Sequence, residues 1–237
     1  MKLNKFMFST HQGVGLLVGI QVFLWISSGF VMSVVPIEKV RGEDWVSESK
    51  PVAVSTSVAL LSPAEITSQA NIENYTSASL KTWLGSPVYR INTNGDSHLF
   101  DAATGKLLSP ITADQARAVA QQDYAGPGTI ADVTLWDEEI IELRGRKLPI
   151  WRVDFDDSRN STVYVSQETG DVATRRNKIW RIFDFFWMLH IMDYNNRDDF
   201  NHPLLITAAV VAWLLATSGL WLVVTWLQRQ NKRRKRA

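Results

Sequence analysis

The sequence of 237 residues contains no cysteine, which excludes a disulfide framework and a thiolate metal site. It also lacks a glycine-rich phosphate loop, a nicotinamide or flavin fingerprint and a nucleophile elbow. The acidic clusters at 137–139 and 198–199 are typical of solvated loops.

Charge is missing from two long stretches of the chain. About twenty-five uncharged residues run from Gln12 to Ile37, and about twenty-four run from Leu204 to Leu227. A helix rises about 1.5 Å per residue, so the second run is about 36 Å long, enough to cross a hydrocarbon core of about 30 Å. The two runs predict two transmembrane helices on either side of a middle segment that can bury a modest core.

Acidic residues are missing from both ends of the chain. All 24 lie in the middle segment, whereas two of the 25 basic residues precede the first run and six follow the second. The middle segment keeps the remaining 17 basic residues, so its net charge is near −7. The positive-inside rule then predicts cytoplasmic termini and a middle segment on the far side, which is the periplasm in a Gram-negative bacterium. The short basic tail is expected to contact anionic lipid and not nucleic acid.

The first uncharged run has a rival interpretation as a secretory signal peptide, because Lys2 and Lys5 would form a basic n-region. The run is longer than the roughly 7–15 residues of a signal-peptide core, and no small-x-small cleavage site follows it. We therefore expect a retained anchor. The predicted fold class is a membrane α+β protein with hairpin topology, in which two transmembrane helices flank a periplasmic α+β domain.

The middle segment contains an internal repeat. Two stretches, which begin near Ser62 and Ile111, open with a capped helix start and helically spaced alanines and continue as alternating strand sequence. Strands are expected at 87–92, 97–101 and 106–108 in the first copy and at 149–154, 162–166 and 171–173 in the second. Each copy is too small to stand easily alone, so we expect the two sheets to pack on each other or to share helices.

The four histidines differ in their surroundings. His98 lies on an expected strand and is interpreted as an ordinary strand residue. His202 precedes Pro203 at the head of the second span, where a helix-entry role accounts for it. His11 and His190 each lie at a membrane boundary in an apolar, aromatic setting. Ionisable side chains are costly there, so these two indicate either interfacial anchoring or metal ligation.

Glycines in the first run share a helical face with His11. At 100° per residue, Gly15 and Gly19 lie about 40° and about 80° from His11, and Gly29 returns to the same angle. The Gly15-x-x-x-Gly19 spacing permits close helix contact, and the missing side chains would also leave room for a flat cofactor held by His11. The two interpretations are compatible. In the second span a comparable stripe of small residues consists of Ala208, Ala212, Ala216 and Gly219.

Short motifs along the chain resemble a known family. The hairpin end Asp101-Ala102-Ala103-Thr104-Gly105-Lys106-Leu107 resembles the PepSY domain, and Ser166–Val172 fits it loosely. The stretches His11-Gln12-Gly13-Val14-Gly15-Leu16, Leu189-His190 and Thr217-Ser218-Gly219-Leu220-Trp221 are similar to the PepSY-associated transmembrane family. The resemblance covers most of the chain, and the order of the motifs makes it specific. It implies that the periplasmic domain consists of two tandem PepSY-like repeats.

The resemblance also implies a cofactor, haem b. Larger relatives with more spans include inner-membrane proteins that reduce ferric siderophores with b-type haems held by membrane-edge histidines. His11 and His190 are the iron ligands that this resemblance implies, with Gly15 and Gly19 beside the cofactor. The two histidines lie a full span of about 33 Å apart, so they cannot hold the same iron. A symmetric homodimer that pairs each histidine with its mate is one solution, and His190 with His202 in one chain is the other.

The expected function is electron transfer across the inner membrane to ferric iron or a ferric siderophore, as a ferric reductase or as an electron-transfer subunit with a separate donor. The alternative is a non-catalytic, membrane-anchored interaction module, because PepSY domains are also associated with restraining peptidases.

The expected parts are a cytoplasmic lead-in (1–11), the first span (12–37), a linker (38–61), the two repeats (62–109 and 110–174), an interfacial aromatic helix with its link (175–202), the second span (203–227) and a basic cytoplasmic tail (228–237).

Overall fold

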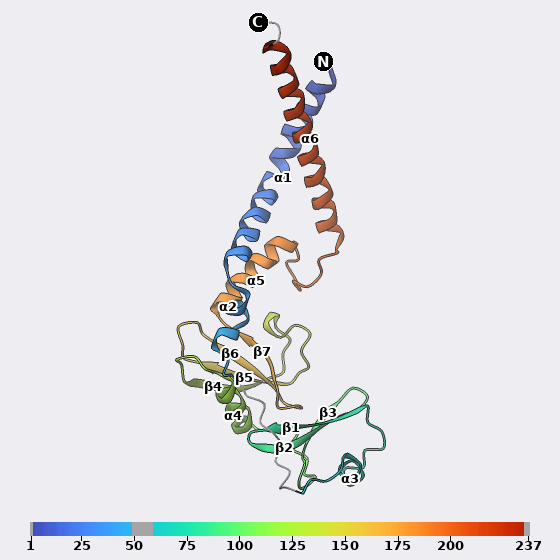
Figure 1. Cartoon of the computed structure of the whole chain (residues 1–237), viewed down its shortest axis with the longest axis vertical. Helices are drawn as coiled ribbons and strands as arrows, with labels where there is room; N and C mark the ends of the chain where they lie inside the picture. The colour runs from blue at the N-terminus through green and yellow to red at the C-terminus, as the bar shows by residue number, and fades with distance from the viewer. Residues whose placement is uncertain (1, 49–58, 235–237) are drawn as a thin grey trace. The chain divides into compact units, whose positions relative to one another are not determined.

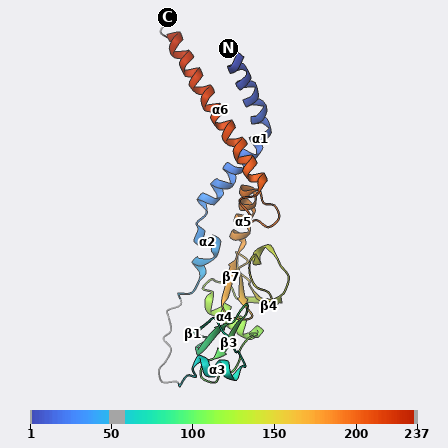
Figure 2. The same cartoon turned by 90° about the vertical axis from the view of Figure 1, so that its right-hand side faces the viewer.

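The computed structural model describes residues 2–48 and 59–234, except for the side chains of 2–5, 7 and 17. The chain forms two compact units (Figure 1, Figure 2). The helical unit consists of the chain up to Val35 and from Ile182 onward, and the sheet unit runs from Pro36 to Arg181. Part of the expected linker, 49–58, lies outside the described residues.

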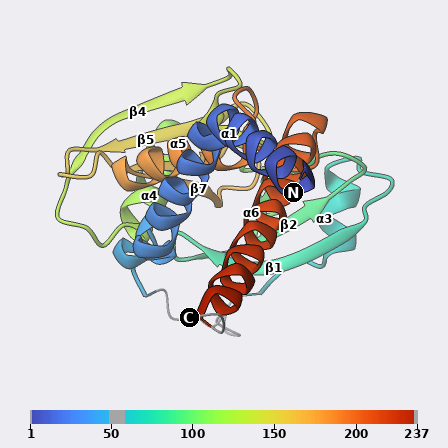
Figure 3. The ribbon, with the colours of Figure 1, turned by 90° about the horizontal axis from the view of Figure 1, so that it is seen from above.

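The helical unit contains α1 (Lys2–Val34), the greater part of α5 (Lys178–Ile191) and α6 (Pro203–Arg234). By length and composition α6 can cross a membrane. Helix α1 meets the same criteria only as two segments, Phe8–Leu16 and Val18–Val34, which are bent by 62° relative to each other. Helices α1 and α6 pack against each other and cross (Figure 3). The described chain therefore has one helix that is clearly long and apolar enough to span a membrane and a second helix that bends within its apolar run.

The helix ends differ from those expected at the polar flanks. The expected lead-in 1–11 is helical from Lys2 onward, and the expected tail continues α6 as far as Arg234. Lysine and arginine are good helix formers, so these flanks extend the helices beyond the uncharged runs. At the other end of the first run, α1 stops at Val34, and Ile37 already belongs to the short helix α2 (Ile37–Arg41).

The sheet unit contains two antiparallel sheets. After α2 and the 3₁₀ helix η1 (Glu43–Trp45), helix α3 (Pro63–Gln69) precedes a sheet of order β1 (Ser77–Trp83), β2 (Ser86–Asn92), β3 (Ser97–Asp101). Helix α4 (Ala113–Asp123) precedes the second sheet, of order β4 (Ile130–Trp136), β5 (Ile150–Phe155), β6 (Thr162–Ser166), β7 (Val172–Arg176), with η2 (Ile141–Leu143) between β4 and β5. Each sheet thus follows one helix in the chain.

Both sheet-unit helices begin with a capping box. The Ser62 hydroxyl accepts from the Glu65 backbone N–H, and the Glu65 side chain accepts from the Ser62 N–H. Thr112 and Gln115 make the same reciprocal pair at α4. Each box satisfies two of the N–H groups that a helix start leaves unpaired, so the sequence fixes where both helices begin.

Two strands were not predicted, and one predicted strand is reduced to a single bridge. Strands β1 and β4 precede the strands expected in each copy, whereas 106–108 contributes only the bridge between Phe100 and Leu107. Strand β1 reads Ser-Ala-Ser-Leu-Lys-Thr-Trp and contains no valine or isoleucine. Cross-strand pairing with β2, rather than strand propensity, therefore holds it in place.

The two sheets share one hydrophobic core. Trp83, Val88 and Leu99 of the first sheet pack in the same cluster as Val153 and Val163 of the second. Side chains of α4 belong to this cluster as well, and α4 packs against the second sheet. Of the two expected arrangements, the packing of the sheets on each other is confirmed.

Polar contacts reinforce the junction between the sheets. The Trp83 Nε1–H donates to the Gly170 carbonyl at 2.9 Å, and the Asp171 carboxylate pairs with Lys81 and with Arg90. At the end of β3, Asp101 Oδ1 accepts from Thr104 Oγ1–H and from the backbone N–H groups of Ala103 and Thr104. Burial raises the pKa of Asp101, but these hydrogen bonds outweigh it and leave that pKa below its usual value.

Candidate functional site

The four histidines lie in different environments, and His98 has the simplest one. It belongs to β3, is half-buried, lies opposite Ile91 and has its ring centroid 6.3 Å from that of Phe100. The other three belong to the helical unit. His98 is therefore an ordinary strand residue, as expected.

His202 caps the start of α6. Its Nδ1 accepts from the Leu205 backbone N–H at 3.4 Å, and its Nε2 lies 2.9 Å from the Ile191 carbonyl, to which it donates. A neutral ring protonated at Nε2 satisfies both contacts. Both ring nitrogens are thus engaged within the chain, which agrees with the helix-entry role.

His11 of α1 contacts Ser218 of α6. The His11 Nδ1 lies 2.8 Å from Ser218 Oγ, and that hydroxyl donates to the Leu215 carbonyl of its own helix at 2.8 Å. A serine hydroxyl has one proton, and with that proton on the bond to the carbonyl we assign the proton of the His11–Ser218 bond to Nδ1. The Nε2 lone pair of His11 is then free to bind a metal, and Nε2 has no hydrogen-bond partner within the described chain.

His190 of α5 makes the same arrangement with α1. Its Nδ1 lies 2.9 Å from the hydroxyl of Ser28, a residue that is 0% exposed. The Ser28 hydroxyl donates to the carbonyls of Leu24 at 2.7 Å and Trp25 at 3.1 Å. By the same argument Nδ1 of His190 is the donor and Nε2 is left with its lone pair. Metal-binding histidines commonly fix their tautomer through such a bond from the second ring nitrogen.

Each imidazole also lies against the glycine that follows its serine. A Cβ placed on Gly219 would lie 3.0 Å from His11 Cε1, and one placed on Gly29 would lie 3.7 Å from His190 Cε1. A Ser-Gly pair on a neighbouring helix therefore holds each histidine. The predicted cofactor glycines are elsewhere: a Cβ on Gly15 would meet Leu215 Cδ1 at 3.8 Å, and one on Gly19 would meet no atom within 4 Å.

Ser28 and Ser218 contact the two histidines, a role that the sequence analysis assigned to neither of them. The sequence signals for them are the recurrence of Ser28-Gly29 and Ser218-Gly219 inside apolar helices, each preceded by a second hydroxyl residue, and, for Ser218, its place in the family motif Thr217–Trp221. The helical wheel placed Gly29 on the face of His11. Because α1 bends by 62° between these positions, one wheel does not describe the whole helix.

The two Ser-Gly sites lie at different levels of the helical unit. Ser28 follows His11 by seventeen residues on α1, a rise of at most about 25 Å. His190 therefore contacts α1 about 9 Å before that helix ends at Val34, closer to His11 than the predicted 33 Å. This separation still prevents one metal ion from binding both. Within the described ranges no three His, Asp or Glu side chains form a metal-binding group.

A folded-back segment supports the end of α5. The Arg197 guanidinium pairs with the buried carboxylate of Asp184, and the Trp187 Nε1–H donates to the Arg197 carbonyl at 3.0 Å. The carboxylate of Asp193 accepts from four backbone N–H groups of 195–199. Burial alone would raise the pKa of Asp193, but these four bonds lower it overall. The connection from α5 to α6 is therefore an ordered turn next to His190.

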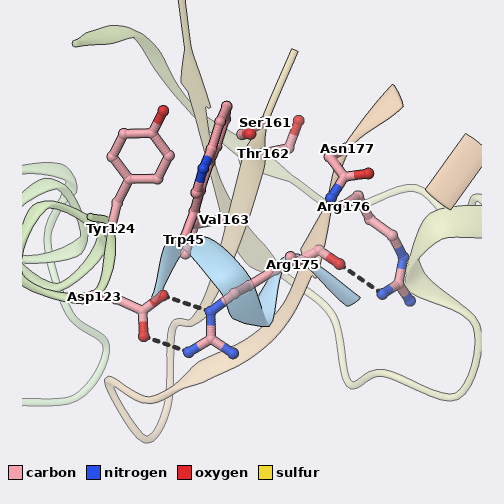
Figure 4. Close-up of a pocket in the computed structure, with 10 residues that line it drawn as sticks. Trp45, Asp123, Tyr124, Ser161, Thr162, Val163, Arg175, Arg176 and Asn177 are labelled. Atoms are coloured by element: carbon pink, nitrogen blue, oxygen red, sulfur yellow. Dashed lines mark hydrogen bonds and ion pairs between the residues drawn. The ribbon is translucent and has the colours of Figure 1, made fainter. Parts of the chain in front are cut away.

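Two hollows lie among the described residues of the sheet unit. A cavity of about 20 Å³ lies between Trp45, Tyr124 and the Asp123–Arg175 ion pair (Figure 4). That volume holds about one water molecule. An open groove of about 410 Å³ contains Glu142 and Asp154, but these acids already pair with Arg181 and Arg152. The histidine sites of the helical unit remain the better candidates.

Comparison with known proteins identifies one family. The family model described as the PepSY-associated TM region matches residues 8–237. No curated protein and no solved structure matches the chain. The matched range includes the apolar helix α6 and the two antiparallel sheets. The chain belongs to the family of PepSY-associated transmembrane regions, as a membrane-associated α+β protein.

Proposed function

We propose that this chain is a haem-b-binding electron-transfer protein of the bacterial inner membrane, with His11 and His190 as iron ligands. One observation carries the proposal: at two levels of the helical unit, a histidine has Nδ1 bound to a serine hydroxyl and Nε2 unused within the described chain. An interfacial histidine that serves only as an anchor does not need the same polar partner and the same adjacent glycine twice.

The residues present fit a haem. Imidazole is a common axial ligand, and here the tautomer that exposes Nε2 is fixed on both rings. Gly29 and Gly219 keep bulk away from the two imidazoles. When bound, haem iron would supply a one-electron ferric–ferrous couple. The chain's own contribution is to hold each ring nitrogen in the ligating tautomer and to surround it with apolar helices.

The proposed topology is a hairpin with both α1 and α6 as spans. The bent α1 is apolar enough to cross a membrane when its two segments are taken together. Both termini would lie in the cytoplasm and the sheet unit, two PepSY-like repeats, in the periplasm, because the acidic residues are confined to the segment between the spans. His11 would then serve the inner side of the membrane and His190 the outer side.

A homodimer completes the proposal. Each site has one imidazole with a free Nε2 among the described residues, and His202 is occupied as a helix cap. A second copy would supply the matching histidine at both levels. The acceptor would be ferric iron or a ferric siderophore on the periplasmic side, and a separate donor would supply electrons.

The test is the optical spectrum of the purified protein from haem-replete cells. We expect Soret and α bands that sharpen when dithionite is added. His11→Ala and His190→Ala should each lose about half of the bound haem, whereas His98→Ala, which alters a strand histidine, should keep all of it. A colourless preparation would sink the proposal and favour the non-catalytic interaction module instead.

A further inference from the structure

Arg176, the last residue of β7, has a half-buried guanidinium with no carboxylate within ion-pair distance in the described chain. Its Nη1 donates to the Thr174 hydroxyl and, at 2.9 Å, to the Arg175 carbonyl, while its Nε is buried without an acceptor. In Figure 4 this side chain points away from Trp45 and Tyr124. A cation withdrawn from water without a counter-charge is costly, so the site favours an anion.

Glu142, the carboxylate that attracts Arg176 most strongly, already pairs with another arginine. The Glu142 carboxylate accepts from Arg181 Nε at 2.7 Å and Nη2 at 3.3 Å, and from the Tyr164 hydroxyl at 2.8 Å. Its charge acts on Arg176 through space, and no ion pair joins the two among the described residues. One carboxylate therefore serves two guanidinium groups, which leaves positive charge in excess.

A second arginine adds to this excess. Arg146 is exposed and makes no ion pair with any described residue. Burial, together with the charges of Arg146 and Arg144, lowers the pKa of Arg176 to about 10, although Glu142 opposes the shift. The positive charge around Arg176 is therefore in excess, and a bound anion would neutralise part of it.

The surroundings indicate where that anion comes from. The Arg176 guanidinium lies 4.2 Å from the centre of the Trp180 ring. Trp180 belongs to the first turn of α5, and this helix exposes Ile182 and Phe185 further along. Tryptophan beside basic and exposed apolar side chains is typical of the membrane interface, where phosphate headgroups are the available anions.

We propose that Arg146 and Arg176 bind the phosphate of an anionic lipid headgroup at the membrane surface. Guanidinium is suited to this ligand because its planar fork matches phosphate oxygens. Nη2 of Arg176 makes no hydrogen bond within the described chain and is available for the contact. The Trp180 ring covers one face of the guanidinium and holds it in place.

The test uses the full chain in vesicles that contain photoreactive phosphatidylglycerol. We expect the cross-link to map to peptides that contain Arg146 or Trp180, and photoreactive phosphatidylcholine to label them less. Arg146→Gln should reduce labelling about fivefold, since one arginine near an anionic surface contributes a factor of that size. Arg146→Lys should retain most of it. Excess inorganic phosphate that abolishes labelling would show that a free anion occupies the site instead.

Arg117→Gln is the matched control. Arg117 is an exposed arginine of the same unit, on α4, and makes no ion pair with the described residues. Its loss should leave labelling unchanged. Equal labelling of Arg146→Gln and wild type, or label confined to other peptides, would overturn the proposal. The exposed Arg146 side chain does not support the fold, so Arg146→Gln should unfold at the wild-type temperature. The haem spectrum of the same sample tests the proposed function independently of lipid binding.

Discussion

At the scale of single residues, Ser28 and Ser218 determine which ring nitrogen of each membrane histidine is available. Both hydroxyls donate to a carbonyl of their own helix and accept from the imidazole N–H. A ligand imidazole that donates to an acceptor is more basic, which stabilises the ferric form. The serines are thus positioning residues for the proposed ligands.

Removing one serine hydroxyl should change the potential of one haem. With Ser218→Ala, the His11 Nδ1–H loses its acceptor, so the midpoint potential of the inner haem should rise by roughly 20–60 mV, the equivalent of one neutral hydrogen bond. A redox titration followed in the α band measures this shift. Ser218→Thr keeps the hydroxyl and should restore the wild-type value. The same potential in the alanine and threonine variants would contradict the positioning role.

A methyl group at Gly219 should displace the His11 ring. The added Cβ would lie 3.0 Å from Cε1, so the imidazole must move. Gly219→Ala should therefore lose about half of the bound haem, measured as the pyridine haemochrome per protomer. Gly13→Ala is the control, because a Cβ there meets no atom within 4 Å. Full haem in both variants would mean that the cofactor does not depend on this contact.

Much of the residue-level site could be read from the sequence, but its partners could not. His11 and His190 stand out because ionisable groups are rare at a membrane boundary. The contacts of Ser28 and Ser218 with these histidines cannot be read from the sequence, since a serine inside an apolar helix usually hydrogen-bonds only to a carbonyl of its own helix. Recognising them requires the relative rotation of α1, α5 and α6, and this depends on the bend in α1 and on the turn that follows α5.

At the scale of elements, the junction between the two sheets depends on Gly170. Its φ is +64°, and a Cβ there would lie 2.7 Å from the Trp83 ring. Gly170→Ala should therefore lower the free energy of unfolding of the sheet unit by about 2–4 kcal/mol, from backbone strain and overpacking together. Urea unfolding followed by tryptophan fluorescence measures the change.

Gly145 provides the matched comparison for this prediction. Its φ is +65°, but a Cβ there would meet no atom within 4 Å. Gly145→Ala should therefore cost only the backbone strain, about 1–2 kcal/mol. If the two variants unfold at the same urea concentration, the contact between Trp83 and the β6–β7 turn does not stabilise the junction.

The elements that the sequence predicts best are those with a local physical signal. The capping boxes mark the starts of α3 and α4, and alternating apolar residues mark β5 and β6. Strand β1 has no such signal and exists because β2 pairs with it along its whole length. The helix ends extend past the uncharged runs because hydropathy detects the membrane-facing stretch and not the hydrogen-bonded helix.

At the scale of the whole molecule, the proposed dimer has a consequence for mixtures of two variants. A tagged His11→Ala copy expressed with wild type would form mixed dimers, each with one imidazole at the inner level. Because the site needs both, mixed dimers should lose the inner haem completely rather than by half. Haem content after tag purification measures this, with tagged His98→Ala as the control. Retention of half of the inner haem would indicate that each chain binds haem alone.

The predicted membrane orientation follows from where the charges lie in the sequence. The packing of one chain on another, as in the proposed dimer, does not follow from the sequence. The confinement of all 24 acidic residues to the middle segment is visible in the order of the amino acids alone. A second copy leaves no comparable trace, because small-residue stripes serve contacts within and between chains equally. Among these small residues, Gly15 and Gly219 can be assigned to contacts within one chain, since Gly15 lies against Leu215 of α6 and Gly219 lies against His11 of α1.

The bond between His190 and Ser28 also affects how the membrane voltage acts on the protein. It separates the two histidine levels by at most about 25 Å, within a hydrocarbon layer of about 30 Å. In the proposed relay, an electron that moves between these levels would cross part of the transmembrane potential, which is worth at most about 2 kcal/mol for each 100 mV. With the cytoplasm negative, the field drives negative charge outward. In the proposed orientation, the membrane potential of a respiring cell would therefore favour electron transfer from the inner haem to the outer haem.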